Sequence, residues 1–120
     1  MRQAYLDGSS GISGDMFLAT LLDAGLAPDR LFGELKKLPL GFYEFKRTRA
    51  VRGNLVGTRV EIRVPGQQPH RKLADIEELL GKTALADTVK EKALRIFRRL
   101  GEVEGKLHGL LPGEVSFHEV

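Results

Sequence analysis

Apolar residues recur at intervals of three and four along four stretches of the chain, and this spacing predicts four amphipathic helices. The first begins behind Ser13, a good N-cap residue, and ends at Gly25, a common helix stop. The second begins at Pro28, which suits the first helical position, and ends before Pro39. Two more helices are predicted over residues 73–80 and 85–107.

The helix predicted over residues 85–107 has the clearest apolar stripe. Gly101 and Gly105 fall in its last turns, where they either weaken the helix or allow another segment to pack closely. Arginines between the apolar positions are expected to face solvent. The stripe consists of Val89, Ala93, Ile96, Phe97, Leu100, Val103 and Leu107.

Alternating apolar and polar residues, many of them β-branched, predict a β-hairpin in the middle of the chain. Its strands are expected over residues 43–51 and 56–64, joined at Gly53 and Asn54. The alternation in the second strand predicts one covered face and one wet face. The residues expected on the covered face are Val60, Ile62 and Val64.

Short strands are also predicted near both ends, from Gln3 to Asp7 and from Glu114 to Val120. The expected order is therefore β-α-α-β-β-α-α-β. It predicts an α/β or α+β fold with a small mixed sheet covered by helices. No internal repeat or convincing linker divides the 120 residues, so we expect a single domain over residues 1–120.

The composition excludes several classes of protein. The chain has no cysteine, which excludes a disulfide scaffold, a zinc ribbon and a thiol nucleophile, and which fits a cytoplasmic location. No apolar run approaches the roughly 20 residues that a membrane-spanning helix needs. With 19 Lys and Arg against 16 Asp and Glu, the net charge is +3. This mild excess permits anionic ligands such as nucleotides but gives no argument for nucleic acid.

The loop between the first predicted strand and the first predicted helix is the best candidate for chemistry. Such a loop presents backbone N–H groups and a positive helix end to a ligand, and ligands of open α/β sheets collect where strands end. It lacks the Gly-Lys-Ser/Thr of a Walker A motif. A capped, glycine-rich turn explains the same residues, so both interpretations stay open. The hypothetical phosphate or Mg²⁺/Mn²⁺ site consists of Asp7, Ser10, Ser13 and Asp15.

Histidines supply a second candidate site. His108 ends the long predicted helix, and His118 and Glu119 follow in the last predicted strand. Imidazole and carboxylate together suit Ni, Zn, Mn or Fe, so the set predicts a metal site if the helix end and the strand converge. A histidine in the last helical turn is also a favourable partner for the helix dipole, which leaves a structural role open.

Positive charge concentrates in the predicted hairpin. A solvated sheet face is the simpler explanation, because charged residues are mostly exposed, and an anion-binding surface is the alternative. The arginines concerned are Arg47, Arg49, Arg52, Arg59 and Arg63.

Four sequence segments, spread from one end of the chain to the other, occur in the order that a known family has. They are Tyr-Leu-Asp-x-x-Ser-Gly-Ile-Ser-Gly-Asp-Met at 5–16, His-Arg-x-Leu-x-Asp-Ile at 70–76, Ile-Phe-Arg-Arg-Leu at 96–100, and His-Gly at 108–109 followed by Phe-His-Glu-Val at 117–120. Together they resemble the LarC family, the nickel-insertion proteins of nickel-pincer nucleotide biosynthesis. The first and last segments are the more specific ones.

The resemblance implies a CTP-dependent cyclometallase, a lyase that inserts nickel into pyridinium-3,5-bisthiocarboxylic acid mononucleotide. CTP is cleaved to CMP and pyrophosphate with a divalent cation, Mg²⁺ or Mn²⁺. The product is the cofactor of lactate racemase and related enzymes. Family members run to several hundred residues, so we expect this chain to be the N-terminal part, cut off at Val120, and to be inactive alone.

One departure from the family pattern affects the candidate metal site. Residue 116 is serine where the family often has the first histidine of His-Phe-His-Glu, which leaves His118 alone on its strand face. His108, His118 and Glu119 nevertheless remain our candidates for nickel. The alternative from another class of function is a non-catalytic module that carries metal or mediates oligomerisation. A homo-oligomer is the assembly that this alternative implies. Nucleic-acid binding through the hairpin is a weaker alternative.

Overall fold

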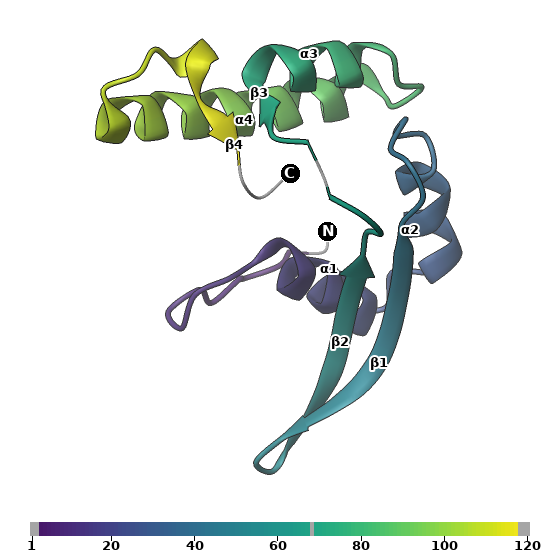
Figure 1. Ribbon diagram of the computed structural model, residues 1–120. Coiled ribbons are helices and arrows are strands. Elements are labelled where there is room, and N and C mark those ends of the chain that lie inside the picture. The colour runs from purple at the N-terminus through teal and green to yellow at the C-terminus, as the bar shows by residue number, and fades with distance from the viewer. Residues whose placement is uncertain (1–2, 68, 118–120) are drawn as a thin grey trace. The chain divides into compact units, whose positions relative to one another are not determined.

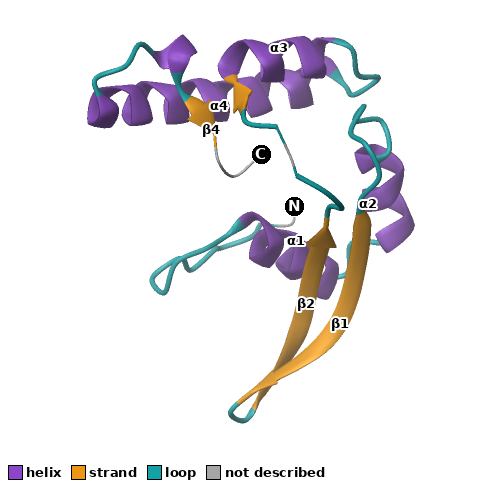
Figure 2. Ribbon diagram, viewed as in Figure 1, coloured by secondary structure: helices purple, strands orange, loops and turns teal. Residues whose placement is uncertain are grey.

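The computed structural model describes residues 3–67 and 69–117, and the chain divides into two compact units. The first unit is built from residues up to Leu31 and from Phe42–Pro65, and the second from Phe32–Gly41 and the residues from Gly66 onward. Helices and two small antiparallel sheets confirm the predicted mixed class of α and β structure (Figure 1, Figure 2). The prediction of a single domain stays a prediction.

The first unit contains the predicted hairpin. Strands β1 (Glu44–Arg52) and β2 (Leu55–Arg63) pair antiparallel along their whole length. Gly53 and Asn54 form the two-residue turn, and Gly53 has φ 58°, a conformation that favours glycine at the first turn position. The hairpin and its turn are therefore confirmed.

Helix α1 (Gly14–Asp23) covers part of one hairpin face. Ala19 and Leu22 of α1 form a buried cluster with Val60, and the Thr58 hydroxyl donates a 2.8 Å hydrogen bond to Asp23. Val60 is buried as predicted, but Ile62 and Val64 are each 46% exposed. A ten-residue helix is about 15 Å long and a nine-residue strand about 30 Å, so α1 covers only part of the face.

The strand predicted over residues 3–7 does not form. The backbone there has no regular secondary structure, and Tyr5 is 91% exposed. Strands β1 and β2 pair only with each other, and none of the described strands lies against this segment. An extended segment without a neighbouring strand has no ladder of hydrogen bonds to hold it. The expected order is therefore not confirmed, because the observed one begins with a helix, and no mixed sheet is formed by the described strands.

Helix α2 (Pro28–Leu35) begins at the predicted proline, and its residues fall partly in each unit. Leu31 packs against the buried cluster of the first unit. Leu38, which follows the end of the helix, packs against the core of the second unit. The two leucines therefore pack in different hydrophobic cores.

The second unit is built on two helices, α3 (Leu73–Gly81) and α4 (Asp87–His108), which pack against each other (Figure 1). A short 3₁₀ turn, η1 (Pro112–Glu114), follows α4. Strand β3 (Arg71–Lys72) pairs antiparallel with β4 (Ser116–Phe117). The last strand is confirmed over these two residues, and the rest of it, 118–120, lies outside the described residues.

The core of the second unit lies between α3, α4 and β4. Ile76 and Leu80 of α3 are buried together with Val115 and Phe117. The ring of Phe117 meets that of Phe97 edge to face, with centroids 5.7 Å apart. Such aromatic pairs add to the stabilisation that comes from apolar burial.

Only part of the apolar stripe of α4 faces this core. Gly101 and Gly105 are buried, and a Cβ added at Gly105 would lie 2.7 Å from the carbonyl oxygen of Leu110. The two glycines therefore allow the chain after α4 to pack closely on the helix, which is one of the two roles predicted for them. Other stripe residues stay exposed, with Ile96 at 61% and Leu107 at 74%.

Candidate functional site

The loop before α1 contains a tight turn that is shaped by Asp7. The backbone N–H of Ser9 donates to Asp7 Oδ1 at 3.0 Å, and the N–H of Gly11 donates to the carbonyl oxygen of Gly8 at 2.9 Å. Hydrogen bonds from the Ser9 backbone and hydroxyl lower the pKa of Asp7. Asp7 and Ser10 are both exposed in this turn.

Ser13 occupies the N-cap position of α1, as predicted, but its side chain does not cap the helix. Its backbone is extended, and its hydroxyl donates to the carboxylate of Asp15 in the first turn. This hydrogen bond is the main cause that lowers the pKa of Asp15, and the charge of Arg59 also lowers it. Ser13 and Asp15 are therefore brought together by the fold.

The lowered pKa values of Asp7 and Asp15 determine how their contribution to folding stability changes with pH. A carboxyl whose pKa is lower in the folded chain than the ordinary 3.8 favours folding when it is ionised. That contribution is present above pH 3.8 and is lost as the pH falls below it. Both groups are accordingly anionic at neutral pH and are available to a cation.

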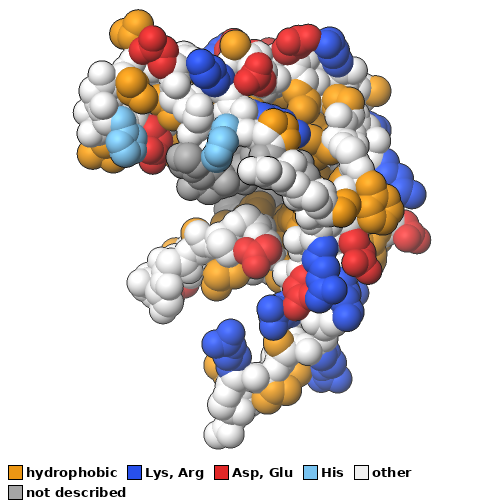
Figure 3. All heavy atoms as spheres, viewed as in Figure 1, with side chains coloured by type: hydrophobic (Ala, Val, Ile, Leu, Met, Phe, Trp, Pro, Cys, Tyr) orange, Lys and Arg blue, Asp and Glu red, His pale blue; other side chains and the backbone are white. Residues whose placement is uncertain are grey.

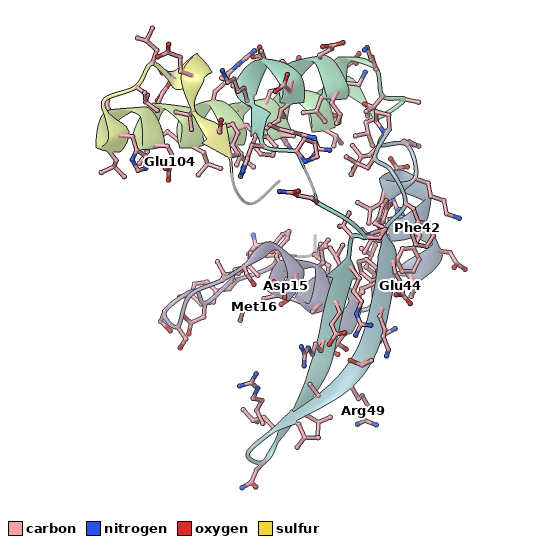
Figure 4. The ribbon with its side chains drawn as sticks, viewed as in Figure 1. Asp15, Met16, Phe42, Glu44, Arg49 and Glu104 are labelled. Carbon is pink, nitrogen blue, oxygen red and sulfur yellow. The ribbon has the colours of Figure 1, made fainter. Side chains whose placement is uncertain are left out.

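Asp15, which is labelled in Figure 4, lines an open cavity of about 360 Å³ together with residues of β2. The charged residues of β2 in this cavity are Arg59, Glu61 and Arg63. Nη2 of Arg59 lies 3.0 Å from Glu61 Oε1, and Nη2 of Arg63 lies 3.2 Å from Glu61 Oε2. The Glu61 side chain is 26% exposed, whereas those of Arg59 and Arg63 are 61% and 65% exposed. Both guanidinium groups therefore reach solvent while they share one carboxylate.

The charges that line this α1–β2 cavity suit a phosphate that is bound together with a cation. Guanidinium groups bind phosphate and carboxylate in a planar, two-point geometry. Carboxylate oxygens are the ligands that Mg²⁺ prefers, and it usually combines one or two of them with substrate phosphates. The cavity offers two guanidiniums, from Arg59 and Arg63, and two carboxylates, from Asp15 and Glu61.

The arginines of the hairpin divide into two groups. Arg59 and Arg63 line the cavity, whereas Arg47, Arg49 and Arg52 are exposed and line none of it. Figure 3 shows Lys and Arg side chains gathered over the hairpin. The position of Asp15 near this part of β2, where the charge of Arg59 acts on it, was not predicted from the sequence. The available signal was the spacing i, i+2, i+4 of Arg59, Glu61 and Arg63, which places three charges on one face of a strand.

The second candidate site is described only in part. His108 is 65% exposed at the end of α4, and its Nε2 lies 3.2 Å from Oε2 of Glu104, one helical turn earlier (Figure 4). His118 and Glu119 lie outside the described residues. Among residues 3–67 and 69–117, no three His, Asp or Glu side chains form a group that could hold a metal ion. Glu104 was missed by the sequence analysis, although its i, i+4 spacing from His108 was the available signal.

None of the described helices is long and apolar enough to cross a membrane.

Comparison with known proteins identifies close relatives. A relative from Syntrophobacter fumaroxidans is 48% identical over the whole chain, and one from Thermomicrobium roseum is 46% identical. A relative from Desulfitobacterium hafniense, 43% identical over the whole chain, is named pyridinium-3,5-bisthiocarboxylic acid mononucleotide nickel insertion protein. The chain spans 30–31% of the length of these three proteins. No solved structure matches it significantly.

A family model described as nickel insertion protein matches residues 4–120. That range includes the loop before α1, the hairpin with its cavity, and α4 with His108. The resemblance seen in the sequence is thereby confirmed, and the chain belongs to the nickel insertion protein family.

Proposed function

We propose that this chain is the N-terminal region of a CTP-dependent nickel-insertion enzyme that builds the nickel-pincer nucleotide cofactor of lactate racemase-type enzymes. The observation that carries the proposal is the family match over residues 4–120. The Desulfitobacterium hafniense relative is named for nickel insertion into a pyridinium bisthiocarboxylic acid mononucleotide. A cytoplasmic location, favoured by the absence of cysteine, is part of the same proposal.

The α1–β2 cavity is our proposed binding site for the anionic end of this substrate. A mononucleotide carries a phosphate, and thiocarboxylic acids are ionised at neutral pH. Arg59 and Arg63 supply guanidiniums that such groups bind, and both reach solvent. When the phosphate enters, it competes with Glu61 for the two arginines. Glu61 is then released to join Asp15 beside the bound anion.

Asp15 and Ser13 are our candidates for the divalent cation that accompanies the phosphate. Asp15 is anionic at neutral pH because the Ser13 hydroxyl and the nearby charge of Arg59 lower its pKa. The cation would neutralise the negative charges of the Asp15 carboxylate and the phosphate. Asp7 and Ser10 do not line the cavity. Their proposed role is to shape the turn that leads into α1 and so to position Ser13 and Asp15.

A pyridine mononucleotide with a carboxylate and a ribose phosphate, nicotinic acid mononucleotide, is a suitable probe of this site. We expect Arg63→Gln to weaken its binding in the presence of Mg²⁺ about tenfold, because one charge-assisted contact is lost. Isothermal titration calorimetry measures the change. Arg52→Gln is the matched control, since it removes the same charge from the turn end of the hairpin, outside the cavity.

Equal weakening by Arg63→Gln and Arg52→Gln would mean that only the general charge of the hairpin matters. That result would contradict a phosphate site in the cavity. Equal affinities in wild type and both variants would contradict it as well.

Nickel is the second substrate of the proposed reaction. His108 and Glu104 already lie together, and we propose that His118 and Glu119 complete the set. Imidazole nitrogen and carboxylate oxygen form a suitable donor set for Ni²⁺.

We expect His108→Ala and His118→Ala each to weaken Ni²⁺ binding about tenfold or more, because each removes one of few ligands. Calorimetric titration with Ni²⁺ measures this. Glu91→Ala is the control, since it removes an exposed carboxylate from α4 near the opposite end of the helix from His108. Equal affinities of the wild type, His108→Ala and His118→Ala would rule out this nickel site.

A further inference from the structure

Glu61 lies between two arginines, and both oxygens of its carboxylate contact them. Its Oε1 lies 3.0 Å from Nη2 of Arg59, and its Oε2 lies 3.2 Å from Nη2 of Arg63. The three residues alternate along β2, so their side chains share one face of the strand. A bound phosphate makes contacts of the same kind, with its oxygens on guanidinium groups. The Glu61 carboxylate therefore occupies the place of an anionic ligand.

These two ion pairs are open to exchange with an anion from solution. The side chains of Arg59 and Arg63 are 61% and 65% exposed, and exposed ion pairs contribute little to folding stability because water screens them. Among residues 3–67 and 69–117, Glu61 is the only acidic residue that forms an ion pair with either arginine. A phosphate can therefore displace one carboxylate and gain both guanidinium groups at little cost to the fold.

Asp15 is the second carboxylate of the α1–β2 cavity, and it lies close to the same charges. The charge of Arg59 lowers the pKa of Asp15, so one guanidinium acts on both carboxylates. While the arginines hold Glu61, Asp15 is the one carboxylate left for a cation among the described residues that line the cavity. Mg²⁺ is commonly bound by one or two carboxylates together with substrate phosphates. Release of Glu61 beside Asp15 and a phosphate completes such a set of ligands.

We propose that Glu61 couples the binding of the phosphate to the binding of the divalent cation in this cavity. The phosphate displaces Glu61 from Arg59 and Arg63, and the released carboxylate then binds the cation together with Asp15. This coupling rests on the phosphate site proposed above, and it means that neither ion binds tightly without the other. Coupling between two ligands is reciprocal, so the cation strengthens the binding of the phosphate by the same factor. The cavity accordingly selects a phosphate monoester together with its divalent cation.

Isothermal titration calorimetry of the 120-residue chain with nicotinic acid mononucleotide measures the coupling, once in excess Mg²⁺ and once in EDTA. We expect the wild type to bind the mononucleotide about tenfold more tightly in Mg²⁺, which is a typical size for coupling between two ligands.

Glu61→Gln removes both the internal competitor of the phosphate and one ligand of the cation. In EDTA it should bind the mononucleotide about tenfold more tightly than the wild type, because no carboxylate competes for the arginines. In Mg²⁺ its affinity should rise only about twofold or less, because Asp15 is then the single carboxylate ligand. Glu44→Gln is the matched control, since Glu44, labelled in Figure 4, lies opposite Arg63 on β1 but does not line the cavity. It should keep the Mg²⁺ effect of the wild type, and circular dichroism confirms that both variants are folded.

The possible results separate the coupling from the phosphate site itself. If the wild type binds the mononucleotide equally in Mg²⁺ and in EDTA, or if Glu61→Gln keeps the full Mg²⁺ effect, the coupling is wrong and the phosphate site stands. The coupling is also wrong if Glu61→Gln binds no more tightly in EDTA than Glu44→Gln does, because Glu61 then does not compete for the arginines. No binding by the wild type in either condition would overturn the coupling and the phosphate site together.

Discussion

Phe117→Ala is expected to lower the free energy of unfolding of the second unit by about 3–5 kcal/mol, the usual cost of deleting a buried aromatic ring. Phe117 is 4% exposed and lies in the cluster with Ile76, Leu80 and Val115. Its ring also meets that of Phe97 edge to face, and its backbone pairs with Arg71. The substitution therefore leaves a cavity where α3, α4 and β4 meet.

Urea unfolding followed at the amide protons of α3 and α4 measures this loss. Leu111→Ala is the control, because Leu111 is 70% exposed in the same unit, and it should change stability by about 0.5 kcal/mol or less. If the two variants lose similar amounts of stability, Phe117 does not hold the core of this unit.

Gly105→Ala should destabilise the second unit by about 1–3 kcal/mol, although alanine is the better helix former. The added Cβ would lie 2.7 Å from the carbonyl oxygen of Leu110, which is a backbone atom. The N–H of Leu110 also donates a 2.9 Å hydrogen bond to the carbonyl oxygen of Gly105, which holds the two segments together. The clash therefore cannot be relieved by a change of side-chain rotamer.

Gly33→Ala is the matched control for this prediction, because the same substitution is made inside α2 with nothing within 4 Å of the new Cβ. It should stabilise the chain by about 0.5–1 kcal/mol through helix propensity alone. Thermal unfolding of both variants gives the comparison. Stabilisation by Gly105→Ala of the same size as by Gly33→Ala would show that the chain after α4 does not pack against Gly105.

Local patterns predicted those parts of the fold that depend on local physics. Gly53 and Asn54 determine the hairpin turn, and Pro28 and Gly25 bound helices, because each acts through its own backbone conformation. The strand predicted at Gln3 to Asp7 failed because a strand needs a neighbour, which alternation cannot supply. Strand β3 was missed because two residues, Arg71 and Lys72, are too few to show alternation.

The candidate site was predicted in part for the same reason. Ser13 and Asp15 are neighbours in the chain, so their hydrogen bond follows from the start of a helix. The nearness of Asp15 to Arg59, whose charge lowers the pKa of Asp15, depends on how α1 packs on β2, where Leu22 and Val60 are buried together. Periodicity also cannot tell which part of the apolar stripe of α4 faces the core, so the exposure of Ile96 and Leu107 was not predicted.

Our central claim is that the α1–β2 cavity receives the phosphate end of a pyridinium mononucleotide. The most direct test is a titration of the ¹⁵N-labelled chain with nicotinic acid mononucleotide and Mg²⁺, followed by amide chemical shifts. We expect the shifts to change at Ser13–Met16 and at Arg59–Arg63, on the elements shown in Figure 4, and little elsewhere. Changes confined to other segments, or none at a saturating concentration of the mononucleotide, would contradict it.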